Sequence, residues 1–195
     1  MKVALRRLEG PWDEGWALDR HTVRSVCVGH DENGRPVFET ERTEVGEATY
    51  RLKYRAEHAL ARPLAQAVAE HICARLDAFD AIVPMPASVR RARQPVGEVA
   101  RALGRIVGRP VLYGLLTRRA VARPMKDLST KAEKLAAIGD GFDVTDRLCG
   151  GDWRRVLLLD DLFATGATMQ AAYTALRTST TISRIDVAAL TWKPP

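Results

Sequence analysis

The sequence has few cysteines, few aromatic residues and no long apolar segment. Its three cysteines, Cys27, Cys73 and Cys149, are odd in number and far apart, so neither a disulfide framework nor a Cys-x-x-Cys metal site is indicated. No apolar run approaches the roughly 20 residues that span a bilayer. The first ten residues also lack the apolar region of a signal peptide. We therefore expect a cytoplasmic protein that makes no contact with a membrane.

Charge of one sign is also limited, because the net charge is only +6 and the pI is about 9.5. This balance suits a polyanionic ligand, but it also suits nucleic acid. The arginines of residues 90–109 and 118–123 are not interleaved with aromatic residues, as they would be on a platform for single strands. DNA binding and homodimer formation both remain open alternatives that no sequence feature supports. The four histidines lack the spacing of metal ligands.

Two common phosphate-binding motifs are absent. A P-loop needs Gly-Lys-Ser/Thr, but Ala167 follows Gly166, and no Gly-x-Gly-x-x-Gly follows a predicted strand. The segment from Val156 to Thr168, VLLLDDLFATGAT, is a different phosphate-binding candidate. Its four aliphatic residues lack period-2 alternation, which predicts a strand buried on both faces of a parallel sheet.

Asp160 and Asp161 follow this apolar run, and we expect them to end the strand. The Thr165–Thr168 turn and a helix predicted over Met169–Arg177 come next. Such a strand, loop and helix place two carboxylates at the carboxyl edge of a sheet, beside an anion site at a helix N-terminus. The alternative is a helix N-cap with a tight turn, but a cap requires only one polar residue.

This segment resembles the phosphoribosyl pyrophosphate (PRPP) motif of the type I phosphoribosyltransferases: an aliphatic run, two acids, a short spacer and Thr-Gly-x-Thr. The resemblance implies that Asp160 and Asp161 hold the ribose 2′ and 3′ hydroxyls and contribute to a Mg²⁺ site, directly or through water. It also implies that the 5′-phosphate is wrapped by Ala164, Thr165, Gly166, Ala167 and Thr168. Purine-salvage members often carry an Asp before Thr-Gly. Ala164 stands there, so a 6-oxopurine acceptor is not expected.

The remaining pattern alternates helices and strands, which predicts an α/β fold with a parallel, Rossmann-like sheet flanked by helices. We divide the chain into a small β-rich hood or flap, residues 1–49, and a phosphoribosyltransferase domain, residues 50–195. In the hood, Asn33-Gly34 predicts a hairpin of His21–Val28 and Pro36–Thr40. In the domain, helices are predicted over Glu57–Leu76, Pro95–Val107 and Ser129–Ile138, and strands over Ala81–Val83, Val111–Leu116 and Ile185–Trp192.

A second phosphate-binding candidate directly follows the strand Ala81–Val83. Prolines restrict this loop, which could therefore bind a diphosphate with little ordering. It resembles a pyrophosphate loop, and the resemblance implies PRPP contacts from Met85, Pro86, Ala87, Ser88 and Arg90. The alternative is a strand terminator followed by a solvated basic helix end.

Three further segments are similar to the ComF-like phosphoribosyltransferases linked to competence. Leu52-Lys53-Tyr54 suggests that Lys53 reaches the pyrophosphate, although a solvated surface lysine is the alternative. Arg118-Arg119 begins a basic loop from which Arg118, Arg119, Arg123 and Lys126 are candidates to close over the leaving group, with Arg118 and Lys126 taken as catalytic. Leu128-Ser129 follows. The chain departs from these relatives in two ways: it lacks their N-terminal zinc module, and Arg93–Gly97 replaces their Arg-Gly-Phe-Asn-Gln.

The leading hypothesis is Mg²⁺-dependent transfer of the 5-phosphoribosyl group of PRPP to a small-molecule acceptor, with inversion and loss of pyrophosphate. Such a reaction needs fixed cations and carboxylates rather than a protein nucleophile. We expect the acceptor to contact the hood and the loop 118–128. Two alternatives remain: a PRPP-binding regulator or competence-type DNA-uptake accessory protein with little chemistry, and a purely structural module, which leaves the two acids unexplained.

Overall fold

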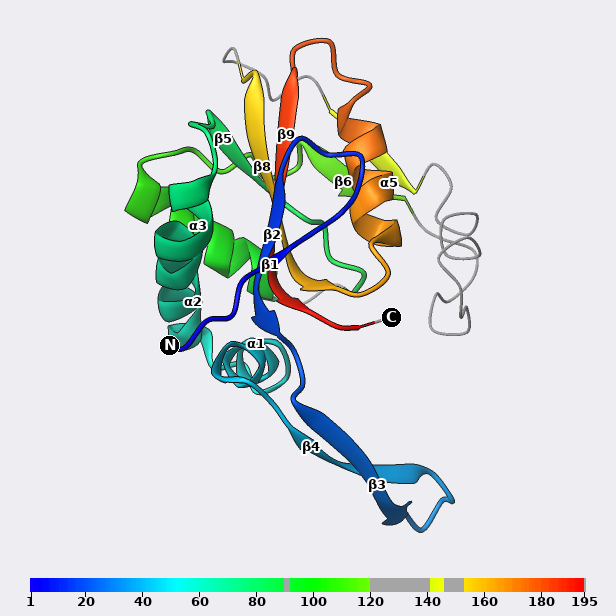
Figure 1. Ribbon diagram of the computed structural model, residues 1–195. Helices are drawn as coiled ribbons and strands as arrows, with labels where there is room; N and C mark the ends of the chain where they lie inside the picture. The colour runs from blue at the N-terminus through cyan, green and yellow to red at the C-terminus, as the bar shows by residue number, and fades with distance from the viewer. Residues whose placement is uncertain (90–91, 120–140, 146–152, 195) are drawn as a thin grey trace.

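A computed structural model describes residues 1–89, 92–119, 141–145 and 153–194. A five-stranded sheet forms its centre, and all its strands are parallel except the first (Figure 1). The predicted α/β class is therefore confirmed. The sheet order is β1 (Arg6–Arg7), β2 (Gly15–Arg20), β9 (Arg184–Trp192), β8 (Arg155–Phe163) and β5 (Ala81–Pro84).

Strand β8 lies inside this sheet because its apolar residues are covered from both sides. The side chains of Val156–Leu159 are completely buried, as the unbroken apolar run predicts. The expectation that the two acids end the strand was wrong, since β8 continues to Phe163. Pairing with β5 stops at Leu159, whereas pairing with β9 continues to Phe163. The acids thus lie where β8 has a neighbouring strand on one side only.

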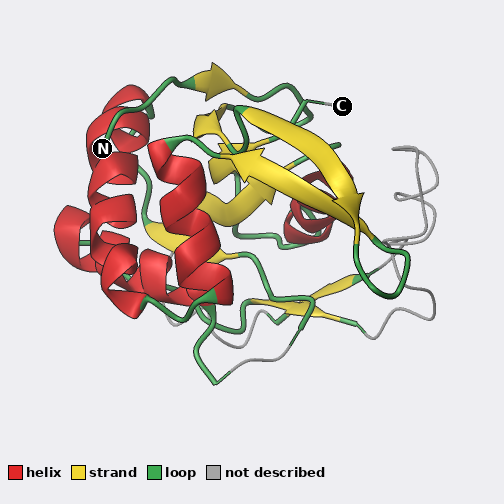
Figure 2. Cartoon of the chain, turned by 90° about the horizontal axis from the view of Figure 1, so that it is seen from below, coloured by secondary structure: helices red, strands yellow, loops and turns green. Residues whose placement is uncertain are grey.

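Helices cover both faces of the sheet (Figure 2). Three helices, α1 (Glu44–Tyr54), α2 (Ala61–Ala67) and α3 (Pro95–Val107), supply one apolar cluster with residues such as Leu52, Leu64 and Leu103. Helix α5 (Ala167–Leu176) packs Met169 and Leu176 into the cluster on the other face. No helix in the described ranges is both long enough and apolar enough to cross a membrane.

Two predicted elements differ from the observed ones. The helix predicted over Glu57–Leu76 consists of short pieces: a 3-10 turn at His58–Leu60, α2, a π-helical segment at Val68–Ile72 and a 3-10 turn at Cys73–Arg75. The strand predicted over Val111–Leu116 was wrong, because Val111 makes only an isolated bridge to Ile82 and the next four residues are not in a strand. A short strand β6 (Leu116–Arg118) instead pairs with β7 (Phe142–Val144). The predicted helix Ser129–Ile138 lies outside the described residues.

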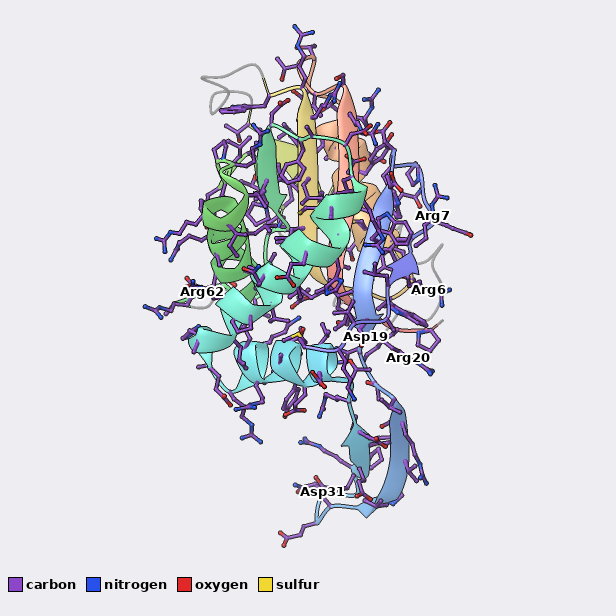
Figure 3. The ribbon with its side chains drawn as sticks, turned by 60° about the vertical axis from the view of Figure 1, so that its left-hand side comes forward. Arg6, Arg7, Asp19, Arg20, Asp31 and Arg62 are labelled. Carbon is purple, nitrogen blue, oxygen red and sulfur yellow. The ribbon has the colours of Figure 1, made fainter. Side chains whose placement is uncertain are left out.

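The N-terminal segment forms the predicted hairpin and also enters the central sheet. Strands β3 (Arg24–His30) and β4 (Pro36–Glu41) pair antiparallel and project away from the body of the molecule (Figure 1). Figure 3 shows Asp31 at the far end of this hairpin. The sequence analysis missed β2, which pairs with β9, and α1, which begins before residue 49. The division at that residue stays a prediction.

Candidate functional site

Asp160 and Asp161 lie side by side on β8, just beyond the last residue that pairs with β5. Asp161 is buried and Asp160 is half-buried. The backbone N–H of Asp161 donates to Oδ1 of Asp160 at 2.8 Å. Two neighbouring carboxylates with little solvent require cations close by, because burial disfavours their charged forms.

Lys53 supplies one of these cations from α1. Thr43 caps this helix, since its hydroxyl accepts from the N–H of Gly46 at 3.0 Å. In the last turn, Nζ of Lys53 lies 2.5 Å from Oδ2 of Asp161. Burial alone lowers the pKa of Lys53, but the Asp161 carboxylate outweighs it and the net pKa is raised. Lys53 is therefore a half-buried ammonium paired with an acid, which excludes the alternative of a solvated surface lysine.

Arg118, at the end of β6, is the second cation of this group. Its guanidinium lies 5.4 Å from the centroid of the Phe142 ring. Burial lowers its pKa and the charge of Asp160 partly opposes that shift. Burial and the charge of Asp161 raise the pKa of Asp160 to about 7, although Lys53 and Arg118 act in the other direction. The structure thus brings together four residues that the sequence analysis selected from three distant segments.

Two residues that the sequence analysis missed, Thr191 and His21, form a chain of hydrogen bonds to the backbone of Asp161. The hydroxyl of Thr191, on β9, donates to the backbone carbonyl of Asp161 at 2.9 Å. Nδ1 of His21 lies 3.0 Å from the same hydroxyl oxygen. Because that hydroxyl has one hydrogen and gives it to Asp161, Nδ1 of His21 is the donor. Burial, reinforced by nearby cations, lowers the pKa of His21 to about 4, so the ring is neutral. No local sequence signal identifies this contact, which depends on the order of β2, β9 and β8.

The turn after β8 leads directly into the N-terminus of α5. Gly166 has a φ of +77°, and a Cβ there would lie 2.8 Å from Cζ of Phe163, so glycine is required. Ala167 and Thr168 open the helix and their amides have no partner within it. The first turn contains no acidic residue, and Ala164 is exposed in front of it. This arrangement can hold an anion.

The loop after β5 begins against the same end of β8. The N–H of Met85 donates to the carbonyl of Leu159 at 2.8 Å, and its side chain is buried in the core. Met85 thus fixes the start of the loop, and both its amide and its side chain are engaged within the protein. Pro86 is half-buried, while Ala87 and Ser88 are exposed. Arg90 and Lys126 lie outside the described residues.

Asp160 and Asp161 offer hard oxygen ligands of the kind that Mg²⁺ prefers. Within the described ranges, no group of three or more His, Cys, Asp or Glu side chains is placed to hold a metal ion. A Mg²⁺ ion at this site would therefore take most of its ligands from substrate oxygens and water, which suits an ion that keeps several waters.

No protein-family model matches the chain, and no curated protein matches its sequence. Among solved structures, it is similar to adenine phosphoribosyltransferase from Trypanosoma brucei, crystallised with AMP, pyrophosphate and ribose-5-phosphate. The TM-score is 0.48 and the sequence identity is 13%, over 90% of this chain and 70% of the other. A likeness of this extent does not establish a shared activity.

Proposed function

We propose that the chain is a Mg²⁺-dependent phosphoribosyltransferase that uses PRPP and releases pyrophosphate. One observation carries the proposal: Lys53, Arg118 and the two adjacent acids form a single charged group next to the N-terminus of α5. The acids belong to the segment that resembles the PRPP motif. A purely structural ion pair would account for one cation beside one acid. It would not account for the glycine turn and the helix N-terminus that follow the two acids.

Each part of this group suits one part of PRPP. The carboxylates of Asp160 and Asp161 would accept hydrogen bonds from the ribose hydroxyls, and the amides of Ala167 and Thr168 would bind the 5′-phosphate. Lys53 and Arg118 would face the charge that grows on the leaving pyrophosphate. Mg²⁺, when bound with the diphosphate, would neutralise part of that charge. In the transfer, the bond between C1 of the ribose and the pyrophosphate oxygen breaks, and the acceptor's nucleophilic atom bonds to C1.

The ion pair between Lys53 and Asp161 sets a requirement for substrate binding. Nζ of Lys53 lies 2.5 Å from the carboxylate, so each group has a partner of opposite charge within the protein. When PRPP binds, the ribose hydroxyls would donate hydrogen bonds to the Asp161 carboxylate in place of Lys53. Nζ of Lys53 would then turn to the diphosphate. Lys53 therefore acts as a binding residue whose charge is already desolvated, which strengthens its attraction for an anion.

The proposal is tested by calorimetric titration of PRPP with and without Mg²⁺. We expect the Asp160→Asn, Asp161→Asn double variant to lose Mg²⁺-dependent binding by at least about 100-fold, since two charged hydrogen-bond acceptors are removed. The matched control is Asp31→Asn, at the far end of the hairpin (Figure 3), which should bind as the wild type does. Equal binding by the wild type and the double variant would refute the assigned site.

Turnover is a separate measurement. Incubation with PRPP, Mg²⁺ and a pool of metabolites, followed by phosphorus NMR, would report the appearance of pyrophosphate. Binding without turnover would favour the alternative of a PRPP-dependent regulator. A DNA-uptake role would additionally require DNA affinity that falls with salt.

A further inference from the structure

The hairpin of β3 and β4, residues 23–41, is an arm with no apolar core of its own. Strand β3 is exposed at every residue, and β4 at all residues but one. Within the described ranges the two strands pack closely only against each other, and Figure 1 shows them projecting away from the body of the molecule. An isolated two-stranded ribbon is marginally stable in water. The arm therefore lacks, within its own chain, the packing that usually supports such a ribbon.

The arm is nevertheless built as an ordered element. Oδ1 of Asp31 accepts from the N–H groups of Asn33 and Arg35, at 2.9 and 2.8 Å, and so fixes the turn. The hydroxyl oxygens of Ser25 and Thr40 lie 3.0 Å apart across the two strands. A flexible linker requires no such contacts. The sequence thus specifies a shaped arm rather than a linker.

Apolar side chains are concentrated on this arm. Of the ten large apolar side chains that are exposed in the described ranges, five lie within residues 23–38. They are 38–57% exposed and belong to Val23, Val26, Val28, Val37 and Phe38. Val26 and Phe38 lie on opposite faces of the ribbon, because Phe38 pairs with Cys27, the residue after Val26. Apolar surface gathered on one exposed element marks an interaction site.

The arm and the remainder of the chain differ in the sign of their charge. Residues 23–41 contain two arginines and four acids, whereas the other residues contain 28 lysines and arginines and 20 acids. The arm therefore carries a net charge of −2 and the remainder carries +8. Some of this positive charge lies at the surface of the body, as at Arg6 on β1 and Arg62 on α2 (Figure 3). A basic body attracts an acidic arm.

We propose that the arm packs against the body of a second copy of this chain, and that two copies exchange arms about a two-fold axis. The charges favour a second copy as the occupant, because it brings a basic body to each acidic arm. A two-fold axis makes the contact reciprocal and closed, so both arms are covered at once. The proposal goes beyond the transferase function and does not depend on it.

Sedimentation of the full chain measures this association. We expect a species of twice the 21.6 kDa chain mass at micromolar concentration. The Val28→Gln, Phe38→Gln double variant should dissociate at least about 100-fold more readily, since two apolar side chains no longer gain from burial. An unchanged circular dichroism spectrum checks that this variant is folded.

The matched control is Ile106→Gln, which places the same polar residue at an exposed apolar position on α3. It should associate as the wild type does. A wild type that stays monomeric at high micromolar concentration overturns the proposal and leaves the arm to a different partner. A double variant that associates like the wild type overturns it as well, because the interface then lies elsewhere.

Charge variants at the turn test the attraction between arm and body. Glu32→Lys makes the arm less acidic and Arg35→Glu makes it more acidic, and both residues are exposed and outside the two strands. We expect the first to weaken the dimer and the second to strengthen it, each by about three-fold. Arg62→Glu changes the net charge of the chain as Arg35→Glu does, but on the body, and should not strengthen the dimer. Equal strengthening by both would show that overall repulsion, and not the arm, sets the affinity.

A mixing experiment distinguishes arm exchange from pairing between two arms. Replacement of residues 23–41 by a short Gly-Ser link gives an armless chain, which should be monomeric alone. A tagged wild-type chain should capture this armless chain through its single arm, more weakly than it captures another wild-type chain. No capture by a wild type that dimerises would show that arms pair only with arms, which refutes the body as the docking surface. An armless chain that still dimerises would refute the role of the arm.

Discussion

At the scale of single residues, the pair of Lys53 and Asp161 joins stability to function. The two side chains are 26% and 12% exposed, so removal of one leaves a charge with little solvent. We expect Lys53→Met to lower the free energy of unfolding by about 1–3 kcal/mol, between the values for surface pairs and buried pairs. Urea denaturation monitored by circular dichroism measures this change.

A double-mutant cycle distinguishes the ion pair with Asp161 from other effects of the Lys53 ammonium. In an Asp161→Asn background, Lys53→Met no longer strands the Asp161 carboxylate, so its cost should fall below about 1 kcal/mol. The same cost in both backgrounds would show that the ammonium stabilises the fold independently of Asp161, as through the charge of Asp160.

Asp160 gives the residue scale a pH dependence. Burial and Asp161 raise its pKa from 3.8 to about 7 in the folded state, so the folded chain keeps a proton that the unfolded chain has released. Stability from this group is present at low pH and is lost as the pH rises from 3.8 through about 7. Asp160→Asn removes that loss. The stability of the variant relative to wild type should therefore increase over this range and level off above it.

Denaturation curves at several pH values in metal-free buffer measure this difference. Glu39→Gln, which removes an exposed acid on β4, provides the control for the loss of one carboxylate. A difference for Asp160→Asn that stays constant with pH would mean that Asp160 titrates alike in both states.

At the scale of elements, the turn between β8 and α5 depends on Gly166. A side chain there meets Phe163 and forces a left-handed residue. We expect Gly166→Ala to cost about 1–2 kcal/mol in the free energy of unfolding and to weaken binding of the 5′-phosphate. Gly97→Ala, within α3, is the matched control: its Cβ would lie 3.5 Å from the nearest atom, and it should stabilise by about 0.5–1 kcal/mol. A gain in stability for both variants would contradict the required conformation.

The elements that the sequence predicted best are those whose signal is local. The apolar run of β8, the Thr-Gly turn and α5 follow one another in the chain, and their pattern alone indicated a sheet edge beside a helix N-terminus. The continuation of β8 beyond Asp160 could not be predicted from local sequence. It depends on backbone pairing with β9, which keeps two polar residues in the strand. The segment Val111–Leu116 had the apolar composition of a strand, but only its two ends pair with other residues, Val111 with Ile82 and Leu116 with Val144.

At the scale of the whole molecule, the site depends on segments that meet only when the sheet is complete. Lys53 arrives on α1, His21 follows β2, and both approach Asp161 from the N-terminal part of the chain. The sequence identified Lys53 as a candidate through the segment Leu52-Lys53-Tyr54. It gave no sign that β2 pairs with β9. Long-range strand pairing has no local signature, which is why His21 and Thr191 were missed.

Because the site depends on a complete sheet, the effects of truncating the chain or deleting a segment can be predicted. A fragment of residues 50–195 lacks β1, β2 and the first half of α1, so it exposes the edge of β9 and loses the completely buried Leu18 and Val45. We expect the fragment to show no cooperative thermal unfolding and to expose apolar surface to a hydrophobic dye. A second variant, in which a short Gly-Ser link replaces residues 23–41, should keep cooperative unfolding. The residues it loses are almost all exposed, and β3 and β4 pack closely only against each other within the described ranges. Cooperative unfolding of the fragment would instead show that residues 50–195 form an independent domain, with β2 an addition to its edge.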